Sequence, residues 1–194
     1  MRVAVASRNP GKLAELRRLL AGRSWELVDL DGAGFQGELT ESGATYEENA
    51  AAKAGAVCAA TGLAALADDS GIEVLALGGW PGPESARWMG PAAGDADRLH
   101  GLLREVERRC PGDRRVRFVC VVTLARPGAR PVSARGETAG VLVAPRGTGG
   151  FGYDPGFLSD DLGVTFGEAP TGAKDGVSHR ARALAGLLAA LRVG

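Results

Sequence analysis

A glycine–lysine pair near the start of the chain is the first group of residues whose types suit phosphate binding. Gly11 and Lys12 close the segment S-R-N-P-G-K, which directly follows an apolar run over residues 2–6. If the run is a strand and a helix begins at this turn, the helix offers free backbone N–H groups and the positive end of its dipole, and Lys12 adds a point charge. The segment predicts a phosphate-binding turn; the alternative is a plain turn with Asn9 as helix cap.

This turn differs from a Walker A loop. That motif has a glycine five residues before its Gly-Lys pair, where this chain has Ala6, and a serine or threonine after the lysine, where it has Leu13. Phosphate binding at this turn would therefore use a different loop geometry.

Two adjacent carboxylates, Asp68 and Asp69, follow an apolar run over residues 63–67. We expect a strand to end at this acidic turn and a second strand to cover residues 72–77. Neighbouring side chains of an extended chain point to opposite sides, so one carboxylate can reach a site while the other braces the turn. A carboxylate beside a phosphate site suits Mg²⁺, which takes a few carboxylates plus phosphates and water. The alternative is a turn that binds no metal.

A second metal ligand is expected in the polar, glycine-rich segment over residues 31–44. Thr45 and Glu48 match a capping box, which predicts a helix start and leaves Glu48 occupied by the cap. Glu41 is the candidate ligand, with Glu38 and Glu47 as competitors.

A loop over residues 145–157 contains glycines that allow close backbone approach and aromatic rings that can stack on a base. Phe151 and Tyr153 supply the rings, and Asp154 can hydrogen-bond a ligand or the backbone. Packing beneath the loop is the alternative for the two rings.

The final predicted helix begins at Ser178-His179-Arg180, which again offers free N–H groups. Arg180 adds a fork of donors for keto oxygens or phosphate. A solvated first turn is the alternative for His179 and Arg180.

The elements that must position these residues form an α/β pattern. A β-α-β opening is followed by helices and strands that predict a mixed sheet flanked by helices, with two lobes around a deep central cleft, in a single domain over residues 1–194. Further helices are expected from Thr45 to Thr61, from an Asp95 cap to Arg109, and from a Ser178 cap to Arg192, and further strands over 116–125 and 132–143.

The composition narrows the function classes. The chain has 194 residues, 45% of them hydrophobic and 24% charged, which is ordinary for a globular domain. Its 23 basic and 23 acidic residues cancel, which argues against binding duplex DNA by bulk electrostatics. No apolar run suits a membrane span, the first apolar stretch is too short for a signal peptide, and three cysteines without a C-x-x-C pair indicate reduced thiols. We therefore expect a cytoplasmic protein without a membrane partner.

The motifs together resemble the inosine triphosphate pyrophosphatase family, whose members hydrolyse non-standard purine nucleoside triphosphates. The resemblance extends over effectively the whole chain, and its five motifs occur in the family's order and spacing. They are S-R-N-P-G-K (7–12), E-S-G-A-T-Y-E-E-N-A-A-A-K-A (41–54), A-D-D-S-G-I-E-V-L-A-L-G-G-W-P-G (67–82) with S-A-R-W (85–88), P-R-G-T-G-G-F-G-Y-D-P-G-F (145–157) and S-H-R (178–180).

The resemblance implies Mg²⁺-dependent hydrolysis of ITP, dITP and XTP to the monophosphate and pyrophosphate, by a homodimer. By position, Asp69 matches the proton acceptor and metal ligand, and Glu41 the acidic position before the capped helix. The matching substrate-binding positions are Ser7, Arg8, Asn9, Pro10, Gly11, Lys12, Ser70, Phe151, Gly152, Tyr153, Asp154, Lys174, His179 and Arg180.

The chain departs from the family pattern at three places. Trp88 stands where the family often has tyrosine, and residues 167–169 and 173–175 differ from the usual stretches. Lys174 keeps its spacing of five residues before His179, so its assignment is retained.

The resemblance leads to one expectation about substrate choice, and other functions remain as alternatives. Donors such as Arg180 and Lys174 favour a 6-keto purine over adenine, whose 6-amino group donates. A related pyrophosphatase acting on modified pyrimidine or methylated nucleotides, and a non-catalytic nucleotide-binding module, are the alternatives; an RNA-binding protein is disfavoured by the neutral charge.

Overall fold

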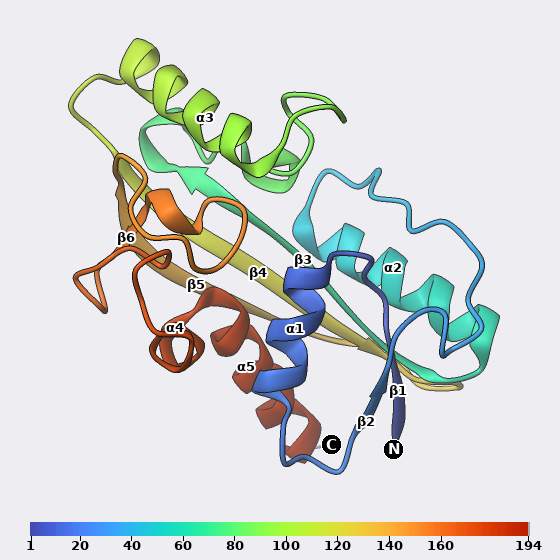
Figure 1. The fold of residues 1–194 in the computed structure, drawn as a ribbon. Helices are drawn as coiled ribbons and strands as arrows, with labels where there is room; N and C mark the ends of the chain where they lie inside the picture. Colours follow the sequence, from blue (N-terminus) through green and yellow to red (C-terminus); the bar gives the residue numbers. More distant parts are fainter. Residues whose placement is uncertain (194) are drawn as a thin grey trace. The chain divides into compact units, whose positions relative to one another are not determined.

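The computed structural model describes residues 1–193, and Figure 1 shows its elements. The strands are β1 (Arg2–Val5), β2 (Glu26–Val28), β3 (Ala64–Val74), β4 (Arg115–Ala125), β5 (Val132–Leu142) and β6 (Phe157–Ser159). The α-helices are α1 (Pro10–Leu19), α2 (Tyr46–Thr61), α3 (Asp95–Arg109), α4 (Thr171–Val177) and α5 (His179–Val193), and short 3₁₀ turns cover Leu75–Leu77, Gly82–Glu84 and Asp154–Gly156.

The strands form one mixed sheet in the order β2-β1-β3-β4-β5-β6. β1 pairs in parallel with β2 and with β3, as the β-α-β opening predicts, and β5 pairs antiparallel with β6. The predicted α/β class with a mixed sheet is confirmed.

The chain divides into two compact units. Unit 1 comprises residues 1–69, 120–136 and 180–194, and unit 2 comprises residues 70–119 and 137–179. The expectation of a deep cleft between two lobes stays a prediction.

Unit 1 has helices on both faces of its strands, because successive side chains alternate between the faces. One face packs on α1 and α5, which lie side by side in Figure 1, and the other packs on α2. The first face carries Val3, Val5, Leu66 and Val122 against Leu16, Leu184 and Leu187, and the second carries Ala4, Ala6, Ala65 and Ala67 against Ala54 and Val57. The small alanines let α2 approach its strands closely.

Unit 2 has its own aromatic core beneath α3. Phe118, Phe157 and Phe166 stack or tilt on one another at ring distances of 4.4–6.1 Å, and Leu99 and Leu102 of α3 belong to the same cluster. This core supports the loop that precedes β6.

The helix starts follow the sequence signals at two sites. Asn9 caps α1 by accepting from the Lys12 backbone N–H, with Pro10 in the first turn. Both arms of the predicted capping box are formed at α2, between Thr45 and Glu48, and Gly62 ends the helix in the left-handed conformation.

Three expectations about elements were wrong. Asp68 and Asp69 do not end a strand: they lie inside β3, which runs unbroken from Ala64 to Val74, and Leu75–Leu77 is a 3₁₀ turn. Asp95 is the first residue of α3, and Gly94 is its cap. The short helix α4 was not expected.

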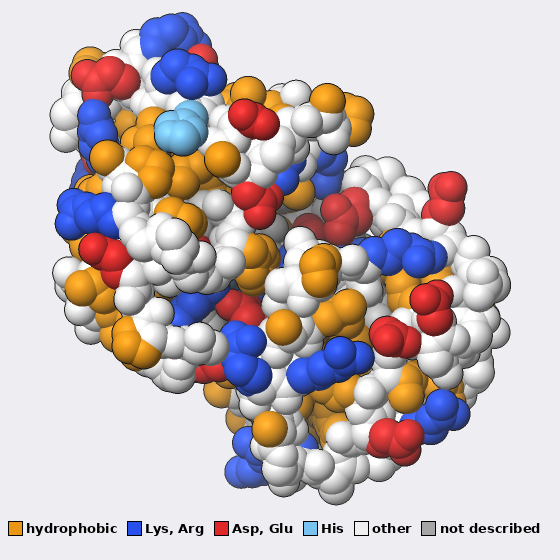
Figure 2. Space-filling model, viewed as in Figure 1, with side chains coloured by type: hydrophobic (Ala, Val, Ile, Leu, Met, Phe, Trp, Pro, Cys, Tyr) orange, Lys and Arg blue, Asp and Glu red, His pale blue; other side chains and the backbone are white. Residues whose placement is uncertain are grey.

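Within residues 1–193, no helix combines the length and the apolar character that a membrane span requires. On the face drawn in Figure 2, basic and acidic side chains are interspersed, in keeping with 23 residues of each sign.

Candidate active site

The predicted phosphate-binding turn begins α1, in unit 1. Ser7 is nearly buried and its Oγ accepts from the Asn9 backbone N–H at 3.2 Å, which fixes the turn before the helix. Arg8 donates to the carbonyl of Gly37 at 3.1 Å, while Pro10 is exposed and Gly11 half-buried. The turn therefore presents Lys12 on a fixed backbone but offers few helix N–H groups, because Pro10 has none and that of Lys12 donates to the Asn9 side chain.

Lys12 points from this turn to Asp68, with Nζ 3.2 Å from Oδ2. Asp68 is buried and also accepts from Arg180 Nε at 3.2 Å and Nη2 at 2.9 Å. Burial alone would raise the pKa of Asp68, but Lys12, Arg180 and Lys53 outweigh it and hold that pKa well below its usual range. Asp68 is therefore the ionised group that orders two cations from two helices.

Arg180 is only 1% exposed, and the sequence did not reveal its second partner. Its Nη1 donates to Glu15, which is also buried and lies one turn after Lys12 on α1. Lys12 and Glu15 are three residues apart and therefore lie on the same face of α1. This spacing was the one sequence feature that could have pointed to Glu15 as part of the site. Arg180 is thus held between two buried carboxylates rather than in a solvated first turn.

Asp69 points to the other side of β3, as the alternation predicts. Its Oδ2 accepts from Asn49 of α2 at 3.1 Å, and its Oδ1 lies 3.4 Å from Lys53 Nζ. Lys53 also donates to Glu41, so one ammonium contacts both carboxylates. Burial raises the pKa of Asp69 above its ordinary value, against the lowering effect of Lys53 and Lys12.

The four acidic candidates for a second metal ligand differ in their contacts. Glu41 alone shares a cation with Asp69. Glu47 pairs with Arg135 at 3.2 Å, Glu48 accepts the backbone N–H groups at the α2 cap, and Glu38 is exposed.

The donor set fits Mg²⁺ in part. Glu41 and Asp69 direct oxygens at one point, where the Lys53 ammonium lies in this structure, so a cation can be shared there. No group of three or more acidic, His or Cys side chains suited to a metal occurs among residues 1–193. Mg²⁺ on two carboxylates would therefore take its remaining oxygens from substrate phosphates and water, which is its usual preference.

In unit 2, the aromatic–glycine loop is held by a buried ion pair. Asp154 Oδ2 accepts from Lys174 Nζ at 2.5 Å and from the Phe151 backbone N–H at 2.8 Å. Gly150 has a φ of +71°, and a Cβ there would lie 2.0 Å from Asp154 Oδ2, so only glycine allows this turn. Lys174 Nζ also lies 5.1 Å from the centre of the Phe151 ring.

The other predicted substrate-binding residues of unit 2 are also ordered. His179 is 5% exposed and stacks on Phe118 at 4.7 Å. Tyr153 is buried, Gly152 bonds through its backbone, and Ser70 lies half-buried in β3.

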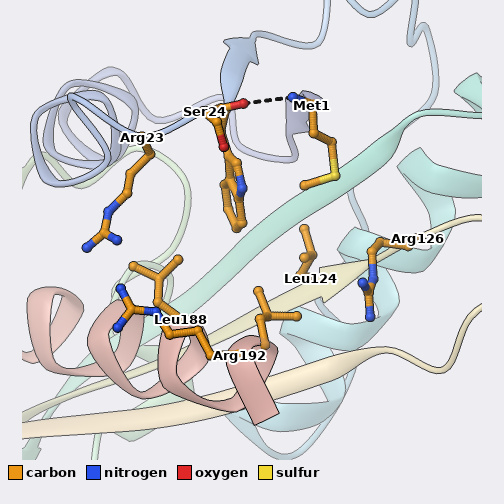
Figure 3. Close-up of a pocket in the computed structure, with 9 residues that line it drawn as sticks. Met1, Arg23, Ser24, Leu124, Arg126, Leu188 and Arg192 are labelled. Atoms are coloured by element: carbon orange, nitrogen blue, oxygen red, sulfur yellow. Dashed lines mark hydrogen bonds between the residues drawn. The ribbon is translucent and has the colours of Figure 1, made fainter. Parts of the chain in front are cut away.

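A pocket of about 330 Å³ lies elsewhere in unit 1, and none of the predicted site residues lines it (Figure 3). Its walls are Met1, Arg23, Ser24, Trp25, Leu124, Arg126, Leu188, Leu191 and Arg192. The charged cluster around Asp68 and Asp69 therefore remains the candidate for chemistry.

A family model described as the Ham1 family matches residues 3–190. The chain belongs to the Ham1 family. Curated relatives named dITP/XTP pyrophosphatase extend over the same length: one from Deinococcus radiodurans is 50% identical over 97% of this chain and 92% of its own, and one from Thermus thermophilus is 46% identical over 100% and 93%.

Solved structures agree with the Ham1 fold. The Ham1 protein of Staphylococcus aureus superposes with a TM-score of 0.87 at 32% identity, covering 99% of this chain and 98% of its own. A HAM1 protein from Coxiella burnetii gives a TM-score of 0.89 at 35% identity, with both chains covered completely. The predicted resemblance to the inosine triphosphate pyrophosphatase family is confirmed by these relatives.

Proposed function

We propose that this chain hydrolyses the non-standard purine nucleoside triphosphates ITP, dITP and XTP to the monophosphate and pyrophosphate, and so cleanses the nucleotide pool. Support comes from relatives at 41–50% identity that carry the name dITP/XTP pyrophosphatase. One observation carries the proposal: Asp69 and Glu41 share a single cation, beside a helix start that presents Lys12.

The phosphate end of the substrate is assigned to unit 1. Lys12 and the positive end of the α1 dipole stabilise the charge that spreads over phosphate oxygens in the transition state. Lys12 is already held by Asp68, so its ammonium needs little reordering on binding. Lys53 adds a second cation near Asp69.

Asp69 is assigned as the proton acceptor. Burial raises its pKa, which makes its carboxylate a better base than an exposed aspartate. Asn49 donates to one of its oxygens and leaves the other toward Lys53. Asp69 orients a water and takes its proton, and attack on the α-phosphorus expels pyrophosphate.

Mg²⁺ is the proposed cofactor, held by Asp69 and Glu41. When bound, it neutralises triphosphate charge and lowers the pKa of a coordinated water. Lys53 must give up part of its contact with both carboxylates to admit it, because it lies between them.

The base end is assigned to the loop of unit 2 and to the residues around Lys174. Phe151 supplies a ring for stacking, and Lys174 is a donor that matches the 6-keto oxygen of hypoxanthine and xanthine. Arg180, which Asp68 and Glu15 hold in unit 1, is tested separately for the same role. Adenine presents a donor at that position and leaves the donors of the site without an acceptor.

A homodimer in the cytoplasm completes the proposal. Light scattering on the purified chain tests the assembly, with about twice the monomer mass of 19.9 kDa expected.

A nucleotide panel tests the function. Pyrophosphate release is measured from ITP, XTP, dGTP and ATP, each with and without Mg²⁺. We expect rapid release from ITP and XTP with Mg²⁺ only. Equal rates with ATP, or turnover limited to modified pyrimidine nucleotides in an extended panel, would reject it.

A further inference from the structure

Within unit 2, two residues outside the predicted site hold the aromatic–glycine loop by hydrogen bonds. Asp95, at the start of α3, accepts from the Gly152 backbone N–H at 2.8 Å across 57 residues of sequence. Trp88 Nε1 donates to the hydroxyl of Tyr153 at 2.8 Å across 65 residues. Two successive residues of the loop are thus fixed by two separate segments.

The Tyr153 hydroxyl uses both of its hydrogen-bonding roles. It accepts from Trp88 and donates to the backbone carbonyl of Ser85 at 2.7 Å. The residue is 6% exposed, and burial raises the pKa of Tyr153 to about 12, so the hydroxyl keeps its proton at neutral pH. Removing the indole N–H would therefore leave a buried oxygen with one bond fewer.

Ser85 connects this arrangement to β3. Its Oγ accepts from the Ile72 backbone N–H at 2.9 Å and lies 2.6 Å from the Gly82 carbonyl oxygen. A Cβ on Gly71 would lie 2.2 Å from that carbonyl, so this close approach requires glycine. Tyr153 is consequently tied to β3 through Ser85, the residue that follows the 3₁₀ turn Gly82–Glu84.

Asp95 is fixed as well. Its second carboxylate oxygen pairs with Arg98 Nη2 at 2.5 Å, and Arg98 also donates to the carbonyl of Ala93 at 2.5 Å. The Trp88 ring is packed between Trp80, at 4.8 Å, and Gly101 of α3. Both holding groups therefore have one defined position.

We infer that Asp95 and Trp88 are positioning residues for the nucleobase, acting through Gly152 and Tyr153 to fix the Phe151 ring and the Lys174–Asp154 pair. The inference rests on the proposed function, in which this loop takes the base. Because the two residues act only at the base end, their loss should weaken binding of a nucleotide but not of a bare polyphosphate.

The test uses Trp88→Phe and Asp95→Ala in the full chain. Trp80→Phe and Asp97→Asn are the matched controls: Phe keeps an aromatic ring against Trp88, and Asn keeps an acceptor for the Gly94 N–H that caps α3. Each variant is assayed for kcat and KM with ITP and for the inhibition constant of tripolyphosphate, which has no base.

We expect KM for ITP to rise about 3- to 10-fold in both test variants, the range for one lost hydrogen bond, with kcat and tripolyphosphate inhibition unchanged. The controls should match wild type. Tyr153→Phe removes the bond to Trp88 and the bond to Ser85, so its effect should be at least as large as that of Trp88→Phe. Trp88→Phe should add nothing to it in the double variant, because the bond that Trp88 makes is already lost.

The experiment distinguishes a failure of the proposed function from a failure of the inference about Asp95 and Trp88. Wild-type protein that does not hydrolyse ITP rejects the proposed function, and the inference falls with it. Active wild type with an unchanged KM in both test variants overturns the inference alone. An equal loss of ITP and tripolyphosphate binding, or an equal loss in the controls, also overturns it, since that marks a general structural effect.

Discussion

The two units hold their candidate site residues by different forces. In unit 1, Lys12, Lys53 and Arg180 come from three helices and converge on two adjacent carboxylates of β3. In unit 2, a loop with glycines at its bends is held by single hydrogen bonds and one buried ion pair. Charges on rigid elements suit phosphate chemistry, which needs fixed electrostatics, while a hydrogen-bonded loop suits shape recognition of a base.

The two kinds of contact should also differ in how much stability the protein loses when one is removed. Removing one partner of a buried ion pair leaves an uncompensated charge, which costs more than losing a neutral hydrogen bond. Variants in the charged cluster of unit 1, or at the buried Lys174–Asp154 pair of unit 2, should therefore impair folding as well as function. Variants that remove only a hydrogen bond of the loop should impair binding alone.

The largest effect is expected at Asp69. Asp69→Asn keeps size and polarity but removes the base, and turnover of ITP should fall about 10²–10⁴-fold. The control is Asp31→Asn, an exposed carboxylate of the same unit. Wild-type turnover in Asp69→Asn at saturating Mg²⁺ would remove the chemistry from unit 1.

Arg180 should have the largest effect on folding. Arg180→Ala leaves Asp68 and Glu15 buried without their shared cation, so the free energy of unfolding should fall by about 3–5 kcal/mol in urea denaturation. Arg126→Ala, an exposed arginine, should change it little. A stability equal to wild type would mean that the buried network is not what fixes Arg180.

The same Arg180→Ala variant tests base reading, if enough folded protein remains. If Arg180 donates to the 6-keto oxygen, the variant should have a smaller ratio of kcat/KM for ITP to kcat/KM for ATP, mainly because its ITP activity is lower. An unchanged ratio would assign Arg180 to phosphate or to support of Asp68.

Lys12 should act on phosphate without reading the base. Lys12→Ala removes a charge-assisted contact, worth about 1.5–3 kcal/mol, so kcat/KM should fall about 10- to 150-fold for ITP and XTP alike. Arg23→Ala is the control for an exposed cation of unit 1. A tenfold change in the XTP-to-ITP ratio would contradict the assignment.

The smallest of these effects is expected in unit 2. Lys174→Met breaks the pair with Asp154 and removes one donor near the predicted base, so kcat/KM for ITP should fall about tenfold and that for ATP less. Arg104→Met on the exposed side of α3 serves as the control. An equal fall for both nucleotides would give Lys174 a purely structural role.

Local signals predicted much of this fold. The capping box fixed the start of α2, and the alternation of β3 correctly sent Asp68 and Asp69 to opposite sides. Two features, the unbroken β3 and the helix α4, could not be predicted, for physical reasons. Adjacent aspartates look like a turn unless distant cations neutralise them inside a strand, and the seven residues of α4 include two glycines, which oppose helix formation.

The sequence could indicate which residues belong to the candidate site but not which residues they contact. Glu15 carries no motif of its own, and only folding shows that it holds Arg180. Asn49 of α2 likewise has no sequence feature that marks it as a partner of Asp69, which lies twenty residues later in the chain. Long-range pairing of this kind depends on the packing of helices on the sheet, which residue spacing alone does not encode.

In the proposed reaction, unit 1 directs water to the α-phosphorus of a non-standard purine triphosphate. The site of attack can be read from hydrolysis of ITP in ¹⁸O-labelled water, with mass analysis of both products. We expect one ¹⁸O atom in inosine monophosphate and none in pyrophosphate. Label in pyrophosphate, or release of inorganic phosphate with inosine diphosphate, would contradict it.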